Sequence, residues 1–205
     1  MPVRHASRAG VTRGDRKRAA IIAGARAVFL GSGFGESSMD AVAARAGVSK
    51  MTVYRHYGSK EALFAGVITD LCEKIVAADE LDAIFERPPH EALRLFAKKM
   101  IEIVFARDTI ELHRIVVAES RRFPKLGQLF YRTGPAACIA ALEAYFSRNA
   151  RNKRFKVRDP RRAAEEFLEL LRGYAHLRVI LGMEKRLGAK EIKDRIDGAI
   201  RHVLL

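Results

Sequence analysis

Residues 38–60 read SMDAVAARAGVSKMTVYRHYGSK, and this stretch decides the fold. It predicts two short helices, over residues 38–46 and 50–56, each with a serine at its start that can cap the first turn. Gly47 lies in the turn between them, where a tight connection favours a residue that accepts a positive φ. Two helices joined by so short a turn form a helix-turn-helix, in which the second helix can enter the major groove of DNA.

The second of these helices is predicted to expose six side chains. They are Lys50, Met51, Thr52, Tyr54, Arg55 and His56. Groups of these types can donate to phosphates, read the edges of bases or contact a thymine methyl group. The pattern therefore predicts a surface suited to DNA, although Tyr54 could instead belong to the core and His56 could be a surface residue without a role.

The charge of the chain is concentrated around this motif. The formal net charge is +14, and residues 1–60 contain 11 basic and three acidic side chains. A basic surface of this kind favours a polyanionic partner, and a solvated face that aids solubility is the alternative. Residues 1–13 are polar and basic, and we expect a flexible arm there whose arginines either follow the minor groove or remain solvated.

The remaining sequence is helical throughout, so an all-α fold of about nine helices is expected. We expect three parts: the arm over 1–13, the helix-turn-helix domain over 14–60, and a further helical domain over 61–205. Besides the two short helices, seven are expected, over 15–31, 60–78, 89–106, 108–121, 125–148 with a possible break at Gly134-Pro135, 160–181 and 189–203.

Several classes of protein are disfavoured. The apolar runs are too short to span a bilayer and no secretory signal is evident, so a cytoplasmic location without membrane contact is expected. Cys72 and Cys138 lack metal-ligand spacing and are expected to be core thiols. The sequence has no phosphate loop, no zinc motif and no nucleophile motif, so we expect no catalytic residue, no metal and no cofactor. Two other classes remain open, namely an architectural DNA-binding protein and a purely structural helical protein.

The resemblance to a known family becomes specific over residues 15–64, which resemble the N-terminal domain of TetR-family repressors. The matching residues are Phe29, Gly33-Phe34, Ser38-Met39, Val42-Ala43, Ala46 to Lys50, Val53-Tyr54 and Tyr57 to Leu63. Residues 114–145 resemble the C-terminal domain of an AefR-like subgroup. The resemblance implies a homodimer that reads a pseudo-palindromic double-stranded operator and represses until a small ligand binds.

The same resemblance implies a set of DNA contacts. They are Ser38, Arg45, Lys50, Met51, Thr52, Tyr54, His56 and Lys60. Residues 50–52 would reach base edges, Thr52 and Tyr54 would contact backbone and bases, and the others would hold phosphates. Position 51 is often glycine in this family, so Met51 makes the operator sequence of relatives a poor guide.

The resemblance also places a ligand cavity in the C-terminal domain, for a hydrophobic or aromatic effector. Its expected lining is Phe96, Met100, Val104, Leu112, Phe123, Phe130, Tyr131, Cys138, Leu142, Phe167 and Tyr174, with plain core packing as the alternative for each. Four polar residues could orient a ligand, namely His113, Glu119, Arg122 and His176.

The last two helices are expected to form the dimer interface. Their apolar stripes contain Phe167, Leu170, Leu171, Leu177, Ile192, Ile196, Ile200 and Val203. At the rim, arginines 172, 178 and 195 could pair with glutamates 165, 169 and 191.

Overall fold

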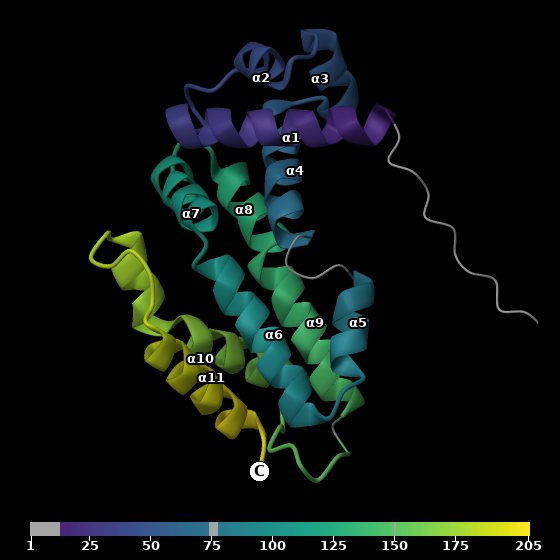
Figure 1. Cartoon of the computed structure of the whole chain (residues 1–205), viewed down its shortest axis with the longest axis vertical. Helices are drawn as coiled ribbons and strands as arrows, with labels where there is room; N and C mark the ends of the chain where they lie inside the picture. Colours follow the sequence, from purple (N-terminus) through teal and green to yellow (C-terminus); the bar gives the residue numbers. More distant parts are fainter. Residues whose placement is uncertain (1–12, 74–77, 150) are drawn as a thin grey trace, which may run out of the picture. The chain divides into compact units, whose positions relative to one another are not determined.

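The computed structural model describes residues 13–73, 78–149 and 151–205, so residues 1–12 of the arm expected over 1–13 lie outside the described residues. These ranges contain eleven α-helices and no strand, which confirms an all-α fold with two more helices than expected (Figure 1). The chain forms two compact units that divide between Val67 and Ile68. This division falls inside a helix, seven residues after the expected boundary at residue 60.

The N-terminal unit consists of α1 (Arg13–Ser32), α2 (Met39–Ala46), α3 (Lys50–Tyr57) and the first part of α4 (Lys60–Glu73). Within it, α2 packs against both α1 and α3 (Figure 1). The two short helices of the sequence pattern are therefore present, each within a residue of its expected ends.

Three phenylalanine rings form the centre of this unit. Phe29 from α1, Phe34 from the following loop and Phe64 from α4 are each fully buried. Their ring centroids are 5.2–5.8 Å apart, with Phe64 edge-on to the other two. Aromatic pairs prefer such offset and edge-to-face arrangements, which stabilise a core beyond the area they bury. The cluster joins three segments of the chain around the helix-turn-helix.

The C-terminal unit contains the rest of α4 and seven further helices. These are α5 (Ala78–Phe85), α6 (Pro89–Val104), α7 (Arg107–Glu119), α8 (Pro124–Thr133), α9 (Pro135–Arg148), α10 (Pro160–Ile180) and α11 (Ala189–Val203). Four of them begin with proline, whose missing N–H and fixed φ suit a first helical turn. Within the described ranges, no helix combines the length and apolar character needed to cross a membrane.

The long helix α10 is the centre of this unit. It packs against α6, α7, α9 and α11 (Figure 1). The side chain of Asp159 caps its start by accepting from the Arg162 N–H at 3.1 Å. Gly173 interrupts the helix with φ 44° and ψ −155°. A large cluster of buried apolar side chains from α6, α9, α10 and α11 fills the space between these helices.

One helix was not predicted, and one possible break is present. Residues 78–85 form the separate helix α5, whereas the pattern predicts a single helix that ends at residue 78. The possible break at Gly134-Pro135 within the helix expected over 125–148 is present, since Pro135 starts α9 directly after Gly134 closes α8.

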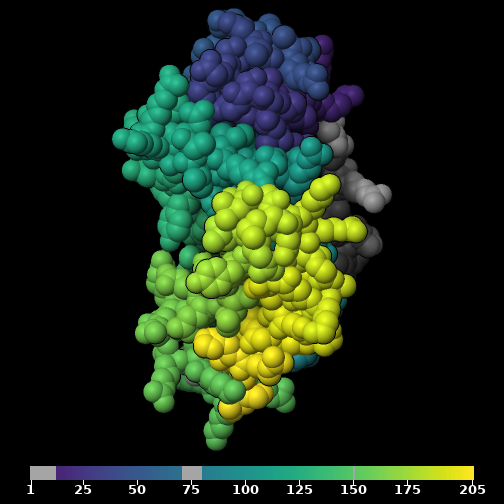
Figure 2. All heavy atoms as spheres, turned by 90° about the vertical axis from the view of Figure 1, so that its left-hand side faces the viewer, coloured from purple at the N-terminus to yellow at the C-terminus, as the bar shows by residue number. Residues whose placement is uncertain are grey.

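One face of α10 leaves large apolar side chains in solvent. Leu170, Tyr174, Leu177 and Leu181 follow one another at intervals of three or four residues, and their exposed fractions are 42–82%. We call these four residues the α10 stripe. Figure 2 shows the side of the C-terminal unit on which the second half of α10, residues 181–188 and α11 form a continuous surface. Contiguous exposed apolar surface of this kind is characteristic of an interaction site.

Candidate nucleic-acid interface and ligand cavity

The turn between α2 and α3 is held by backbone geometry. Ser38 caps α2 by accepting from the Ala41 N–H at 3.1 Å, and Ser49 caps α3 by accepting from the Thr52 N–H at 3.2 Å. Between them Gly47 has φ 65° and ψ 33°, the left-handed region that a side chain disfavours. Both helix ends are thereby fixed, so the orientation of α3 relative to α2 is set by the turn itself.

The third helix is buried on one side and exposed on the other. Val53 is fully buried, whereas Met51 is 75% exposed and Tyr54 is 40% exposed. Arg55 and His56 also lie on the exposed side. A helix that is fixed at its start and presents a cation, an imidazole, a phenol and a flexible thioether has the chemistry needed to contact DNA bases and phosphates.

Other expected DNA contacts have local partners within this unit. The Lys50 ammonium lies 2.8 Å from a carboxylate oxygen of Asp40, and both side chains are more than half exposed. The hydroxyl groups of Ser49 and Thr52 are 2.8 Å apart. Arg45 is exposed in the last turn of α2. The partners of Lys50 and Thr52 are exposed, so exchanging them for a phosphate costs little desolvation.

Lys60 is different, and its expected role as a phosphate anchor is at odds with its surroundings. Its ammonium donates to the carbonyl oxygens of Phe34 at 2.7 Å, Gly35 at 3.1 Å and Ser37 at 2.9 Å. An ammonium has three protons, so these bonds use its whole donor capacity. Lys60 therefore holds the loop between α1 and α2 against the start of α4. The sequence could not reveal this role, because carbonyl acceptors in a loop leave no residue signature.

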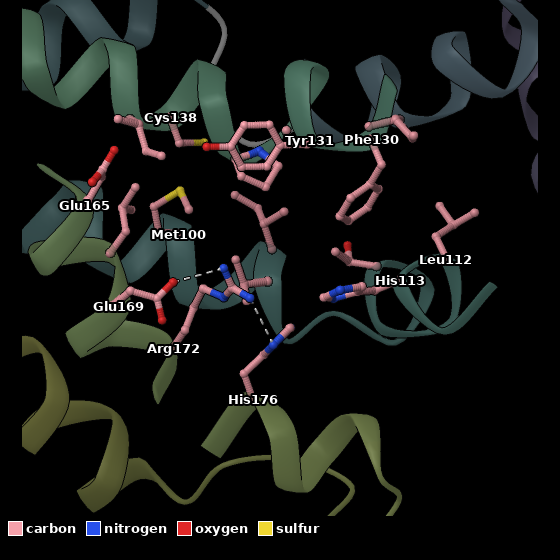
Figure 3. A pocket seen from close by; sticks show the side chains of 18 residues that line it. Met100, Leu112, His113, Phe130, Tyr131, Cys138, Glu165, Glu169, Arg172 and His176 are labelled. Atoms are coloured by element: carbon pink, nitrogen blue, oxygen red, sulfur yellow. Dashed lines mark hydrogen bonds and ion pairs between the residues drawn. The ribbon is translucent and has the colours of Figure 1, made fainter. Parts of the chain in front are cut away.

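A separate site lies within the C-terminal unit, where the structure encloses a cavity of about 550 Å³ (Figure 3). Its volume is typical of small-molecule sites, which span roughly 300–1,000 Å³. The apolar part of the wall consists of Ile68, Met100, Ile103, Val104, Leu112, Phe130, Cys138, Ile139 and Leu168. The polar part consists of Thr109, His113, Tyr131, Glu165, Glu169, Arg172 and His176.

The structure brings together about half of the expected cavity lining. Six expected residues line the wall: Met100, Val104, Leu112, Phe130, Tyr131 and Cys138. Three others, Phe96, Leu142 and Phe167, belong to the buried core instead. Phe123 lies just before α8 and does not line the wall. All four are apolar, and an apolar side chain is equally suited to core and cavity, so residue type could not separate them.

Tyr174 was expected in the cavity but is 82% exposed. It belongs to the α10 stripe, because it borders the same surface depression as Leu170 and Leu177. Of the four polar residues expected to orient a ligand, His113 and His176 line the cavity, whereas Glu119 and Arg122 do not.

Three polar residues of the cavity wall were expected at the dimer rim. They are Glu165, Glu169 and Arg172, all on α10. Their spacing of four and then three residues puts them on one helix face. His176 lines the same cavity from beyond the interruption at Gly173. This spacing is readable from the sequence, and it could have identified the polar wall.

The polar wall contains two imidazoles that are kept neutral. Burial lowers the pKa of His176 to about 4, and the neighbouring Arg172 guanidinium and His113 add to the effect. Burial also lowers the pKa of His113, again with a contribution from Arg172. The two rings lie 5.2 Å apart, and the His113 ring stacks on Phe130 at 5.1 Å. Near pH 7, Arg172 is therefore the cation of this cluster.

Comparisons with known proteins agree on one family. Residues 21–67 match the family described as bacterial regulatory proteins, tetR family, and residues 91–205 match the AefR-like transcriptional repressor C-terminal domain. A solved structure from Mesorhizobium loti MAFF303099, assigned to TetR-family transcriptional regulators, has a TM-score of 0.77 and 25% identity, covering 93% of this chain and 96% of that one.

Two further proteins are similar to this chain. The solved structure of the Flavonoid-responsive Regulator FrrA is 36% identical, with a TM-score of 0.70, and the match covers 91% of this chain and 94% of that one. The HTH-type transcriptional activator FasR of Mycolicibacterium smegmatis is 35% identical over 63 residues, which are 31% of this chain and 29% of FasR. The chain thus spans less than a third of the length of that curated relative.

Proposed function

Because this chain belongs to the TetR family of bacterial transcriptional regulators, which are DNA-binding proteins and not enzymes, we propose that it is a cytoplasmic repressor released from its operator by a small effector. The observation that carries the proposal is α3, a helix fixed by caps at its start and exposed on one face beside the turn from α2. The N-terminal unit would read DNA, and the C-terminal unit would bind the effector.

The proposed DNA contacts follow from exposure on α2 and α3. Lys50 and Arg45 would hold phosphates, since each is an exposed cation. Met51 and Tyr54 would contact bases, because each is exposed on α3 and carries no charge. Ser38 and His56 are exposed, Thr52 is half-buried, and these three residues complete the proposed interface. Lys60 is left out, because the loop carbonyls already use its three protons.

The proposed effector is a small hydrophobic or aromatic molecule bound in the cavity of the C-terminal unit. The volume of about 550 Å³ and the apolar wall with a few polar groups support this assignment. FrrA is named as flavonoid-responsive, and its 36% identity extends over nearly the whole chain. A planar aromatic effector is consistent with that relationship and with the Phe130 ring in the wall.

The direction of regulation has two candidates. Repression is supported by the match of residues 91–205 to the C-terminal domain of AefR-like repressors. Activation is the second candidate, because FasR, which is similar over 63 residues, is named as an activator. In vitro transcription from a promoter that carries the bound sequence separates them: repression predicts less transcript with protein and recovery with effector.

We propose a homodimer through α10 and α11. The α10 stripe leaves four large apolar side chains exposed, although most apolar residues of α11 are already buried within the chain. A pseudo-palindromic operator follows from this symmetry, since two copies of α3 would read two half-sites. Successive major-groove faces lie roughly 34 Å apart on one side of the duplex.

The DNA-binding proposal is tested by selecting bound sequences from a random duplex pool and measuring affinity by fluorescence anisotropy at several salt concentrations. Lys50→Ala should weaken binding about tenfold and reduce the slope of log affinity against log salt by about one. Lys190→Ala is the matched control, because its ammonium is also exposed and lies 2.9 Å from an aspartate. Equal affinity of the Lys50 variant and the wild type would exclude α3 as the reading helix.

The contribution of Met51 is tested on the selected sequence and on a scrambled duplex. Its exposed side chain is uncharged, so Met51→Ala should reduce affinity for the selected sequence several-fold and leave the scrambled duplex unaffected. Lys50→Ala should weaken both duplexes by a similar factor. A uniform loss for the Met51 variant would assign that side chain to positioning rather than to base reading.

A further inference from the structure

We propose that the effector is an aromatic carboxylate, bound with its carboxylate group at Arg172 and its ring against the apolar wall. This inference rests on the proposed function, because it specifies the chemistry of the effector that the cavity would take. It is carried by the guanidinium of Arg172, which lies inside the cavity with its neighbours drawn around it in Figure 3.

The hydrogen bonds of Arg172 are weak for an arginine with limited exposure. Its Nη1 lies 3.4 Å from Glu169 Oε1, and its Nη2 lies 3.5 Å from His176 Nδ1. Arg178, on the same helix, donates to two glutamates at 2.8 Å and 2.9 Å. Charge-assisted bonds are normally about 2.7–2.9 Å long, so the guanidinium of Arg172 has donor capacity to spare. A carboxylate matches its planar fork and can accept two parallel hydrogen bonds.

The groups around Arg172 add neutral hydrogen-bond donors. Among the residues that the structure describes, Thr109 Oγ1 is buried without a hydrogen-bond partner and lines the cavity. Buried hydroxyl groups are nearly always paired, so this one indicates a missing partner. His113 and His176 each carry one ring N–H when neutral, and both rings point to the part of the cavity that contains Arg172 (Figure 3). An oxyanion would satisfy several of these donors together.

A cationic ligand is the rival, because Glu165 and Glu169 also line the cavity. Both carboxylates are well solvated. The Glu169 side chain is 68% exposed, and the Glu165 side chain is 47% exposed and lies 3.3 Å from Arg161 outside the cavity wall. The Arg172 side chain is 31% exposed. A charge that is less solvated acts more strongly on a ligand, so the cavity favours the anion.

Three probes of nearly equal shape distinguish the candidates: 2-naphthoate, 2-naphthamide and 2-naphthylmethylammonium. Their affinities are measured by isothermal titration calorimetry on the whole chain at pH 7. We expect 2-naphthoate to bind at least tenfold more tightly than either of the other two. Equal or tighter binding of the amide overturns the proposal, tighter binding of the amine replaces it with the cationic ligand, and no binding of any probe at millimolar concentration also overturns it.

Two arginine variants test whether Arg172 causes the preference for 2-naphthoate over 2-naphthamide. Arg172→Gln should reduce the preference for acid over amide to less than threefold, whereas Arg178→Gln, on the same helix but outside the cavity, should keep it. An unchanged preference in Arg172→Gln overturns the assignment. The comparison of probes on the wild type still decides the ligand class if that variant does not fold.

Operator binding is measured in the same samples, which separates this inference from the proposed function. Selective binding of 2-naphthoate by a chain that binds no DNA would support the carboxylate site and contradict the regulator. Release of DNA by the amide as readily as by the acid would support the regulator and contradict the carboxylate site.

Discussion

Lys60 and Phe34 are joined twice: the Lys60 ammonium donates to the Phe34 carbonyl oxygen at 2.7 Å and lies 4.6 Å from the centroid of the Phe34 ring. The same ring packs edge-on against Phe64, one turn further along α4. One lysine thereby satisfies the carbonyl groups of a loop that begins in the core and ends at the cap of α2. The position of the helices proposed to contact DNA depends on this loop.

Removing the Lys60 ammonium should destabilise the N-terminal unit. In Lys60→Met three carbonyl oxygens lose the ammonium, and hydrogen bonds to a charged group are worth about 1.5–3 kcal/mol each. We expect a loss of about 2–4 kcal/mol, because water reaches part of the loop and the Phe34 carbonyl keeps the Ser37 N–H. Urea denaturation followed by circular dichroism measures the change.

Lys50→Met is the control for this experiment, since its partner is exposed and its removal should leave stability unchanged. Measured at a temperature where both variants are folded, DNA affinity should show the reverse order: near wild-type for Lys60→Met and weakened for Lys50→Met. A Lys60 variant with full stability and weak DNA binding would restore the phosphate-anchor interpretation.

The close approach of α4 to Tyr57 can be tested with two glycine substitutions. A Cβ at Gly66 would lie 2.7 Å from Tyr57 Cε1 and 3.1 Å from Ile22 Cδ1, whereas nothing lies within 4 Å of a Cβ at Gly31. Gly66→Ala should therefore cost about 1–3 kcal/mol through overpacking. Gly31→Ala, inside α1, should instead stabilise by about 0.5–1 kcal/mol. Thermal unfolding measures the change in stability of both variants. A Gly66→Ala variant as stable as the wild type would contradict the tight contact.

The buried His176 should make stability depend on pH. Its pKa in the folded chain is about 4, against 6.5 without burial, so between these values the unfolded chain binds a proton that the folded chain does not. The contribution of His176 to the free energy of unfolding is therefore fully present above pH 6.5 and is lost as the pH drops toward 4. Since each pKa unit corresponds to roughly 1.4 kcal/mol, we expect about 1–2 kcal/mol to be lost between pH 7 and pH 5.

The contribution of His176 to the pH dependence of stability is isolated by comparing variants at pH 7 and pH 5. His113, Arg172, Glu165 and Glu169 share the cavity wall, so the wild type contains their contributions as well. His176→Gln should lose less stability than the wild type between the two pH values, because it lacks the buried imidazole. Identical pH profiles of His176→Gln and the wild type would contradict a neutral buried imidazole.

The proposed dimer is tested by placing a charge in the α10 stripe. Tyr174→Glu or Leu177→Glu should convert a particle of twice the 22.9 kDa chain mass into a monomer in sedimentation equilibrium. Val117→Glu is the control, because Val117 is 62% exposed on α7, outside the stripe. Dimers that persist in both stripe variants would place the interface elsewhere.

The helix-turn-helix could be predicted in detail from the sequence because its signals are local. Serine caps, Gly47 in the turn and the buried Val53 each act within a few residues, and they fixed α2 and α3 to within a residue. The role of Lys60 could not be predicted in this way. Its acceptors are backbone groups more than 20 residues away, and their arrangement exists only after the three phenylalanines have packed.

The cavity was harder to predict for a different reason. An apolar residue such as Phe167 has the same periodicity whether it faces the core or a cavity, so the distinction depends on the packing of all the helices. The polar wall is easier to recognise, because a charged residue such as Arg172 is rarely found inside a helical unit unless a partner group is present. From the sequence alone, Arg172 is expected only to form an ion pair at the rim of a dimer.

The two faces of α10 have a consequence for binding by the whole assembly. Arg172 and His176 face the cavity, while Leu170 and Tyr174 on the same helix belong to the exposed stripe. In a dimer joined through that stripe, a shift of α10 caused by an occupant of one cavity also displaces the surface shared with the other protomer. The two effector sites would then be thermodynamically linked, and occupancy of the first would change the affinity of the second.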